Sequence, residues 1–169
     1  MRALWYKQQV RISTATILLV TALLAWPSPI RANIGDTLTE LRARYGSAKD
    51  MGGQMLFEIR LKDGQIIPAR GTADVENHFT VNVYFDGVHS AMEIFTRNSS
   101  DPKKSEMTQT DIDTILAAQN DGMKWTPMQL ANGKSVYVSA DNKLLARFRA
   151  NSTGKVDDAS VLMIMLNSK

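Results

Sequence analysis

The two histidines, His78 and His89, are the first residues to test for chemistry, because imidazole acts as a base and a metal ligand near neutral pH. Both lie in segment 78–96, where apolar and polar residues alternate around Asp86-Gly87. A hairpin there puts the two rings at opposite ends, roughly 20 Å apart at about 3.3 Å per residue. That distance excludes a shared metal ion, and a single histidine suggests no set of nucleophile, base and orienting group.

The carboxylates give no clear acid–base pair either. Asp111 and Asp113 are two residues apart, so on a helix they cannot face one ligand. Asp157 and Asp158 are adjacent in a polar segment, which favours a solvated turn over a calcium site. None of the GxGxxG, P-loop, GxSxG or HExxH patterns occurs. We therefore expect no enzymatic activity, no cofactor and no bound metal, although a glycosidase-like pair of distant carboxylates stays open.

The nine methionines are the remaining candidates for metal chemistry. Met92, Met163 and Met165 lie in apolar strand patterns, and a copper site needs methionines in a polar, exposed context. We expect the methionines to fill the core.

Segment 78–96 also supplies the expected binding surface. The Asp86-Gly87 pair favours a two-residue hairpin turn, which sets Phe85 opposite Val88 and Val81 opposite Met92. One face of this hairpin is then apolar and belongs in a core. The other face is mixed, and we expect it to meet a partner through Thr80, Asn82, Tyr84, His89 and Glu93.

Residues 1–32 have the pattern of a secretory signal peptide. Arg2, Lys7 and Arg11 precede the apolar run Ile12–Trp26, whose 15 residues are few for a membrane span. Prolines end the run, and residues 30–32 offer a cleavage site. Cleavage there removes four basic and no acidic side chains, which leaves 16 basic against 17 acidic ones. A near-neutral chain gives no electrostatic reason to bind nucleic acid.

The chain contains no cysteine, so it forms no disulfide and has no thiol for a lipid anchor. We expect an exported bacterial protein, periplasmic or secreted, with no stable membrane anchor once the signal peptide is cleaved.

Two capping boxes predict the helices. In this motif a threonine side chain and an acidic side chain three residues later bond each other's backbone. Thr37 with Glu40 opens a helix that ends near Gly46, and Thr108 with Asp111 opens a second helix. Strands are predicted at 55–61, 66–67, 134–140, 144–150 and 159–166, besides the hairpin of 78–96. The continuous apolar character of 159–166 predicts a strand buried on both faces.

The two parts of the chain repeat this order, because Thr37 lies 71 residues before Thr108 and Phe57 the same distance before Met128. The predicted fold class is α+β, with two capped helices packed on antiparallel sheet. The domain organisation is either two tandem half-domains, 33–100 and 101–169, or one domain, 33–169.

The segment Ile34-Gly35-x-Thr37-x-x-Glu40-Leu41-x-x-x-Tyr45-Gly46 resembles the first helix of small outer-membrane assembly lipoproteins and of the repeats in β-lactamase inhibitor protein. The resemblance implies a small antiparallel sheet after the helix and a function in binding other proteins. The lipid-bearing cysteine of the first family and the disulfides of the second are absent, so an anchor or an inhibited target does not follow. The chain after residue 32 is also similar to uncharacterised secreted bacterial proteins.

These observations favour an exported, non-enzymatic binding module with a protein or another envelope component as its partner. The alternative is a periplasmic hydrolase or a small-ligand-binding protein with a pocket between helices and sheet.

Overall fold

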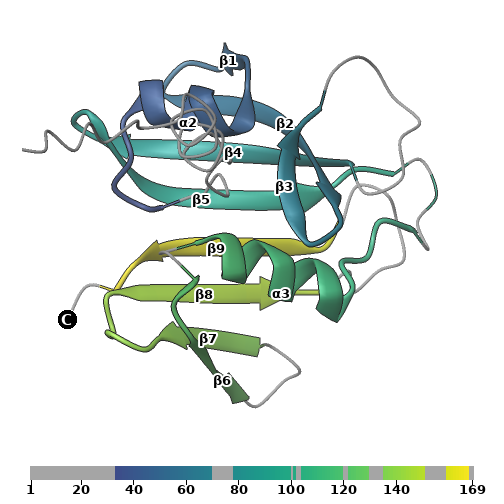
Figure 1. The fold of residues 1–169 in the computed structure, drawn as a ribbon. Coiled ribbons are helices and arrows are strands. Elements are labelled where there is room, and N and C mark those ends of the chain that lie inside the picture. Colours follow the sequence, from purple (N-terminus) through teal and green to yellow (C-terminus); the bar gives the residue numbers. More distant parts are fainter. Residues whose placement is uncertain are drawn as a thin grey trace, which may run out of the picture.

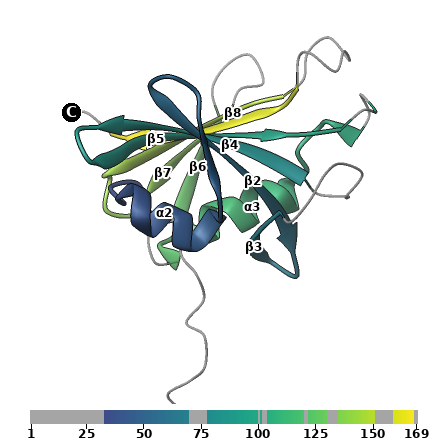
Figure 2. The same cartoon turned by 90° about the horizontal axis from the view of Figure 1, so that it is seen from above.

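The computed structural model describes residues 33–69, 78–99, 101, 104–119, 122–129, 135–150 and 159–167, and the segment expected to be a signal peptide, 1–32, lies outside them. The described residues form two helices and one nine-stranded antiparallel sheet, so the predicted α+β class is confirmed. Both helices lie on the same face of the sheet, as the view from above shows (Figure 2). Neither of these helices is long or apolar enough to cross a lipid bilayer.

The first half of the chain supplies one helix and five strands (Figure 1). They are α2 (Leu38–Tyr45), β1 (Ala48–Asp50), β2 (Gln54–Lys62), β3 (Gln65–Pro68), β4 (His78–Asp86) and β5 (His89–Arg97). The second half supplies one helix and four strands. They are α3 (Gln109–Ala118), β6 (Trp125–Gln129), β7 (Ser135–Ser139), β8 (Leu144–Arg149) and β9 (Val161–Leu166).

The strand order is symmetric about the centre of the sheet. It runs β1-β2-β4-β5-β9-β8-β7-β6, with β3 paired to β2 outside this path. Each half is thus a helix followed by an antiparallel meander of four strands, apart from the extra strand β3. The last strands of the two halves, β5 and β9, pair with each other and make the sheet continuous. By topology β2 corresponds to β7, so the predicted match of Phe57 with Met128, which lies in β6, is wrong.

Both capping boxes form as predicted. Thr37 N donates to Glu40 Oε2 at 2.8 Å, and Thr108 N donates to Asp111 Oδ2 at 2.8 Å. In each half the residue before the capping threonine also bonds a buried serine at the start of the last strand. Asp36 N donates to Ser90 Oγ at 3.1 Å, and Met107 N donates to Ser160 Oγ at 3.1 Å. The same serine bond therefore fixes the helix start to the centre of the sheet in both halves.

The predicted register of the β4–β5 hairpin is wrong. Asp86 pairs with His89, so the two turn residues are Gly87 and Val88, one position later than predicted. Gly87 has φ +62° at the first turn position, where a type II′ turn requires glycine. A bulge between the pairs Phe85–Ser90 and Tyr84–Met92 shifts the register by one further residue.

The register decides which residues of β5 face the helices. The β4 residues Phe79, Val81 and Val83 are fully buried, as predicted. Their partners in β5 are Arg97, Phe95 and Glu93 instead of Ile94, Met92 and Ser90. Because neighbouring residues of a strand point to opposite faces, Met92 and Ile94 lie on the face away from the helices.

The core contains residues from both halves. Leu41 and Tyr45 of α2 and Ile112 and Ile115 of α3 pack in one cluster with the inner faces of both meanders. Strand β9 contributes Leu162 and Ile164, while its alternate residues are half-buried on the other face. The prediction that this strand is buried on both faces is therefore wrong.

The two capping boxes give a matched pair for a stability test. Asp111 caps α3 and also forms a 2.8 Å ion pair with Arg97, and only 9% of its side chain is exposed. We expect Asp111→Ala to lower the free energy of unfolding by about 3 kcal/mol, a loss that is typical when one partner of a mostly buried ion pair is removed. Urea unfolding checks this, with Glu40→Ala as the control, because that capping box lies in water. Equal losses in the two variants would contradict the role given to the Arg97 pair.

Candidate functional site

A stripe of apolar residues crosses the sheet on the face away from the helices. Tyr84 pairs with Met92, Met92 with Met165, and Met165 with Leu145. Leu145 in turn pairs with Val138, so this single row crosses five strands from β4 to β7. Tyr84 is 36% exposed, and the other members of the row are half-buried.

The adjacent rows add one further apolar pair and then polar side chains. Asn82 pairs with Ile94, and Ile94 with Met163. The next row starts with Thr80 paired to Thr96. We call these residues together the open face. It comprises Thr80, Asn82, Tyr84, Met92, Ile94, Thr96, Val138, Leu145, Met163 and Met165.

The prediction that these methionines fill the core fails for the three on the open face. Met92 and Met165 are direct cross-strand partners. Met163 lies two residues before Met165 in β9, on the same face of the sheet. No described helix covers them, and all three are half-buried. Methionine is flexible and polarisable, which suits an adaptable apolar contact surface.

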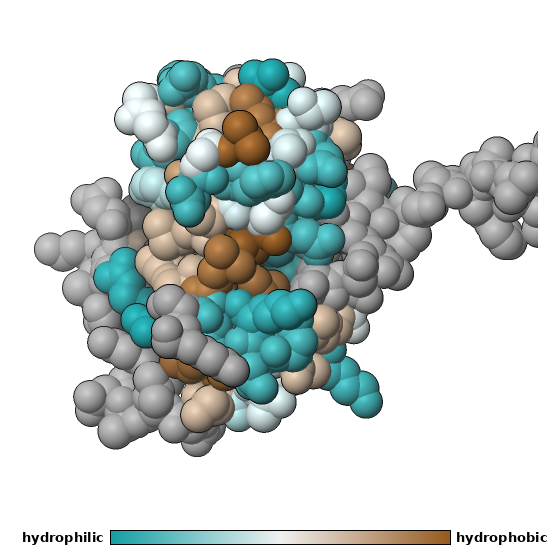
Figure 3. Space-filling model, turned by 90° about the vertical axis from the view of Figure 1, so that its left-hand side faces the viewer, coloured by the Kyte–Doolittle hydropathy of each residue, from teal (hydrophilic) through white to brown (hydrophobic). Residues whose placement is uncertain are grey.

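Apolar surface also reaches one end of the sheet. Figure 3 views the molecule from the side of the β4–β5 turn and the last residues of β9, and hydrophobic residues gather in the middle of that view between polar ones. Val88 in the turn is 69% exposed and Leu166 at the end of β9 is 53% exposed.

The structure brings together three of the five residues predicted to form the binding surface. Thr80, Asn82 and Tyr84 lie on the open face, two residues apart along β4. His89 lies beside the turn, where its Nδ1 is 2.8 Å from the carbonyl oxygen of Gly35. Glu93 does not belong to this surface, because its exposed fraction is 0% and it lies among the core residues under the helices.

Glu93 is the centre of a buried polar cluster, whereas the sequence pattern predicted it on the outer face of the hairpin. Its Oε2 accepts a hydrogen bond from the Tyr45 hydroxyl at 2.9 Å and another from Gln119 Nε2 at 3.0 Å. Its Oε1 and the Gln119 side-chain oxygen are buried, and neither has a hydrogen-bond partner among the described residues. Tyr45 is the last residue of α2 and Gln119 caps α3, so one carboxylate connects both helices to β5.

Burial raises the pKa of the Glu93 carboxyl above its ordinary value of 4.5. The hydrogen bonds from Tyr45 and Gln119 and the charge of Arg44 act in the opposite direction and are the smaller causes. Burial, the charge of Glu93 and its hydrogen bond raise the pKa of Tyr45 well above 10.0. Burial thus favours the neutral form of both side chains.

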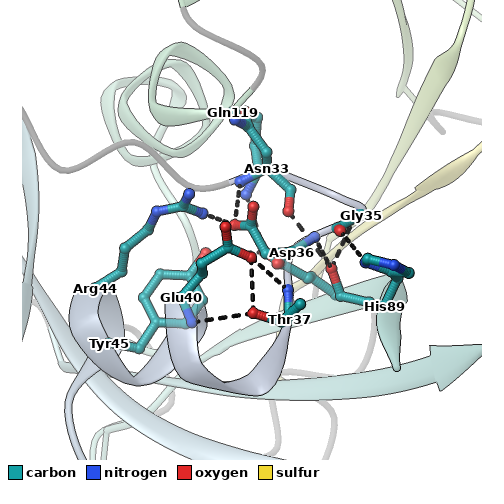
Figure 4. Close-up of polar contacts among 11 residues, drawn as sticks. Asn33, Gly35, Asp36, Thr37, Glu40, Arg44, Tyr45, His89 and Gln119 are labelled. Carbon is teal, nitrogen blue, oxygen red and sulfur yellow. Dashed lines mark hydrogen bonds and ion pairs between the residues drawn. The ribbon is translucent and has the colours of Figure 1, made fainter. Parts of the chain in front are cut away.

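A second polar network holds the loop before α2 against α2 and β5 (Figure 4). Arg44 reaches back to Asp36, whose Oδ2 also accepts from the backbone of Asn33 at 3.1 Å. Gly35 N donates to Ser90 O at 2.8 Å, and Ser90 N donates to Asp36 O at 2.8 Å. These bonds hold the start of α2 against β5 and orient the helix over the core.

The arrangement of these buried carboxylates supports a structural role better than a catalytic one. A catalytic acid must reach its substrate, whereas Glu93 is completely covered by protein. Asp111 is already committed to Arg97 and the α3 cap. Among the described residues, no group of three or more His, Asp or Glu side chains is close enough to hold a metal ion.

One signal in the sequence pointed to Glu93. A glutamate stands between Met92 and Ile94 in the otherwise apolar stretch 91–95. The bulge after Ser90, which decides the face of that glutamate, has no signature in the sequence.

Comparisons of the chain with protein-family models, with curated proteins and with solved structures found no match.

The raised pKa of Glu93 predicts how stability depends on pH. The unfolded chain releases this proton near pH 4.5, while the folded protein holds it to higher pH, so unfolding releases a proton. Stability should therefore fall as pH rises above 4.5 and become constant above the folded pKa. The stability of Glu93→Gln should not decrease in this way as pH rises, because an amide does not ionise in this range. It should also be at least as stable as the original chain at pH 7, since the amide keeps an acceptor for Tyr45.

Urea unfolding between pH 4.5 and 8 tests this, with Glu106→Gln, at an exposed position, as the control. An unchanged pH slope in Glu93→Gln would exclude the buried carboxyl as its source.

Proposed function

We propose that this chain is an exported, non-enzymatic binding protein that engages another protein through the open face. The observation that carries the proposal is the row of cross-strand partners Tyr84, Met92, Met165, Leu145 and Val138. A sheet face that stays apolar over five strands, with no described helix over it, is typical of an interaction surface. Export is inferred from the pattern of residues 1–32.

The polar residues beside this row suit a protein partner. Thr80, Asn82 and Thr96 can form hydrogen bonds at the rim of an apolar contact, which is the usual anatomy of protein interfaces. Tyr84 combines a large apolar ring with a hydroxyl group, and tyrosine is enriched among residues that dominate binding energy. In the row that contains Asn82 and Ile94, Arg147 is exposed and pairs with Met163, which supports a partner with an acidic rim.

The alternative of a periplasmic hydrolase has less support. A hydrolytic carboxylate pair must border an open cleft, and the buried carboxylates Glu93 and Asp111 each bond to structural partners. Both groups hold the fold together in this interpretation, which leaves binding as the function that the geometry supports best.

Site-specific photo-crosslinking in the native host tests the proposal. A photoreactive phenylalanine derivative at Ile94 or Met163 should give a defined adduct with a second protein, because these two positions are cross-strand partners in the open face. The same group at Ala43, exposed on the outer side of α2, is the matched control and should give none.

A second variant tests the apolar contact itself. Replacing Met92, Met163 and Met165 with threonine keeps strand-forming residues while removing the apolar surface. The yield of the Ile94 adduct should fall at least tenfold, since a loss of about 1.4 kcal/mol already weakens binding by that factor. Thermal unfolding must show that the variant is folded. Equal adducts from Ala43 and Ile94, or an adduct of two copies of this chain alone, would overturn the proposal.

A further inference from the structure

A groove of about 490 Å³ lies between α3 and two strands of the sheet, the edge strand β6 and its neighbour β7. It is on the helix side of the sheet and separate from the open face. Its walls include Trp125, Tyr137, Leu116 and Met123, and its polar side chains include Gln109 and Asp113. Apolar and polar groups contribute about equally to the surface of the groove, and aromatic walls beside a few polar groups can bind a small ligand that has both characters.

Hydrogen bonds hold the two aromatic walls in place. Trp125 Nε1 donates to the carbonyl oxygen of Leu116 at 2.8 Å, which ties the indole ring to the last turn of α3. The amide of Gln109 lies between Tyr137 and Asp113, at 3.4 Å from the hydroxyl and 2.8 Å from the carboxylate oxygen. Both rings and the carboxylate are therefore positioned by contacts within the protein.

The charged side chains described in the wall of the groove have one sign. Among the described lining residues Asp113 is the only carboxylic acid, and none is a lysine, arginine or histidine. The groove also borders the C-terminal end of α3, where the helix dipole is negative. The last turn of α3 carries no basic residue, whereas the last turn of α2 carries Arg42 and Arg44. The faces of aromatic rings add further negative potential.

We propose that this groove binds a small organic cation, an ammonium group with apolar substituents. Trp125 and Tyr137 would contact the substituents, and Asp113 would balance the charge. An anion would meet the carboxylate and the negative helix end, so the charge of the wall excludes it. A neutral apolar molecule would contact the rings but would not balance the charge of Asp113. The groove and the open face belong to the same sheet but have no residue in common. This proposal is therefore independent of the one made for the open face.

Fluorescence of Trp125 provides a direct test in the full chain. Replacing Trp5 and Trp26 with phenylalanine leaves Trp125 as the sole tryptophan of the three in the sequence. Choline is the probe, and its uncharged isostere 3,3-dimethylbutan-1-ol is titrated at the same ionic strength. We expect a saturable fluorescence change with choline and at least tenfold weaker binding of the alcohol, because only the cation gains the cation–π and carboxylate contacts.

Asp113→Asn removes the charge while keeping the side-chain shape, and it should weaken choline binding about fivefold. Asp63→Asn, in the β2–β3 turn, removes the same charge away from the groove and should leave binding unchanged. The comparison of choline with the alcohol needs neither variant, so it decides even if Asp113→Asn unfolds. Equal binding of the two probes, or no saturable change with choline, overturns the proposal.

Discussion

One carboxylate oxygen in the core connects the two halves of this protein. Glu93 Oε2 accepts from Tyr45, which ends the helix of the first half, and from Gln119, which caps the helix of the second half. Without this oxygen both donors would be buried with no acceptor at that position, a loss of about 1–3 kcal/mol for each group. The hydrogen bonds therefore favour one position of α2 relative to α3 over the shared sheet.

Because the two halves of the fold are nearly symmetric, the residues of this cluster can be compared with the equivalent residues of the second half. Tyr45 stands eight residues after the capping threonine of α2, and Leu116 stands eight residues after that of α3. Ser90 and Ser160 are equivalent, because each bonds the residue before the capping threonine. Glu93 lies three residues after Ser90, and one of these residues is added by the bulge. Glu93 therefore corresponds to Leu162, which lies two residues after Ser160. A polar pair in one half thus occupies the positions of two leucines in the other. Apolar residues could fill that space with equal or greater stability, so the polar pair contributes geometry more than free energy.

Local patterns predicted the helices and most strands, because their signals involve only a few neighbouring residues. The capping box of Thr37 with Glu40 is one example. The hairpin of β4 and β5 could not be predicted in detail. Gly87 supports a turn as its first or its second central residue, and the bulge after Ser90 depends on tertiary contacts. A shift of one residue exchanges the faces of a strand, so it moved Glu93 into the core and Met92 out of it.

This exchange also explains why the binding surface was predicted only in part. Thr80, Asn82 and Tyr84 belong to β4, whose faces were assigned correctly, whereas the apolar stripe beside them needs β5, β8 and β9 in the observed register. The central pairing of Met92 with Met165 joins strands from different halves. The open face therefore exists only when the halves are assembled, and Glu93 on the opposite side of β5 fixes that assembly. In this way a fully buried carboxylate, with no access to any partner, determines the geometry of the surface proposed to bind one.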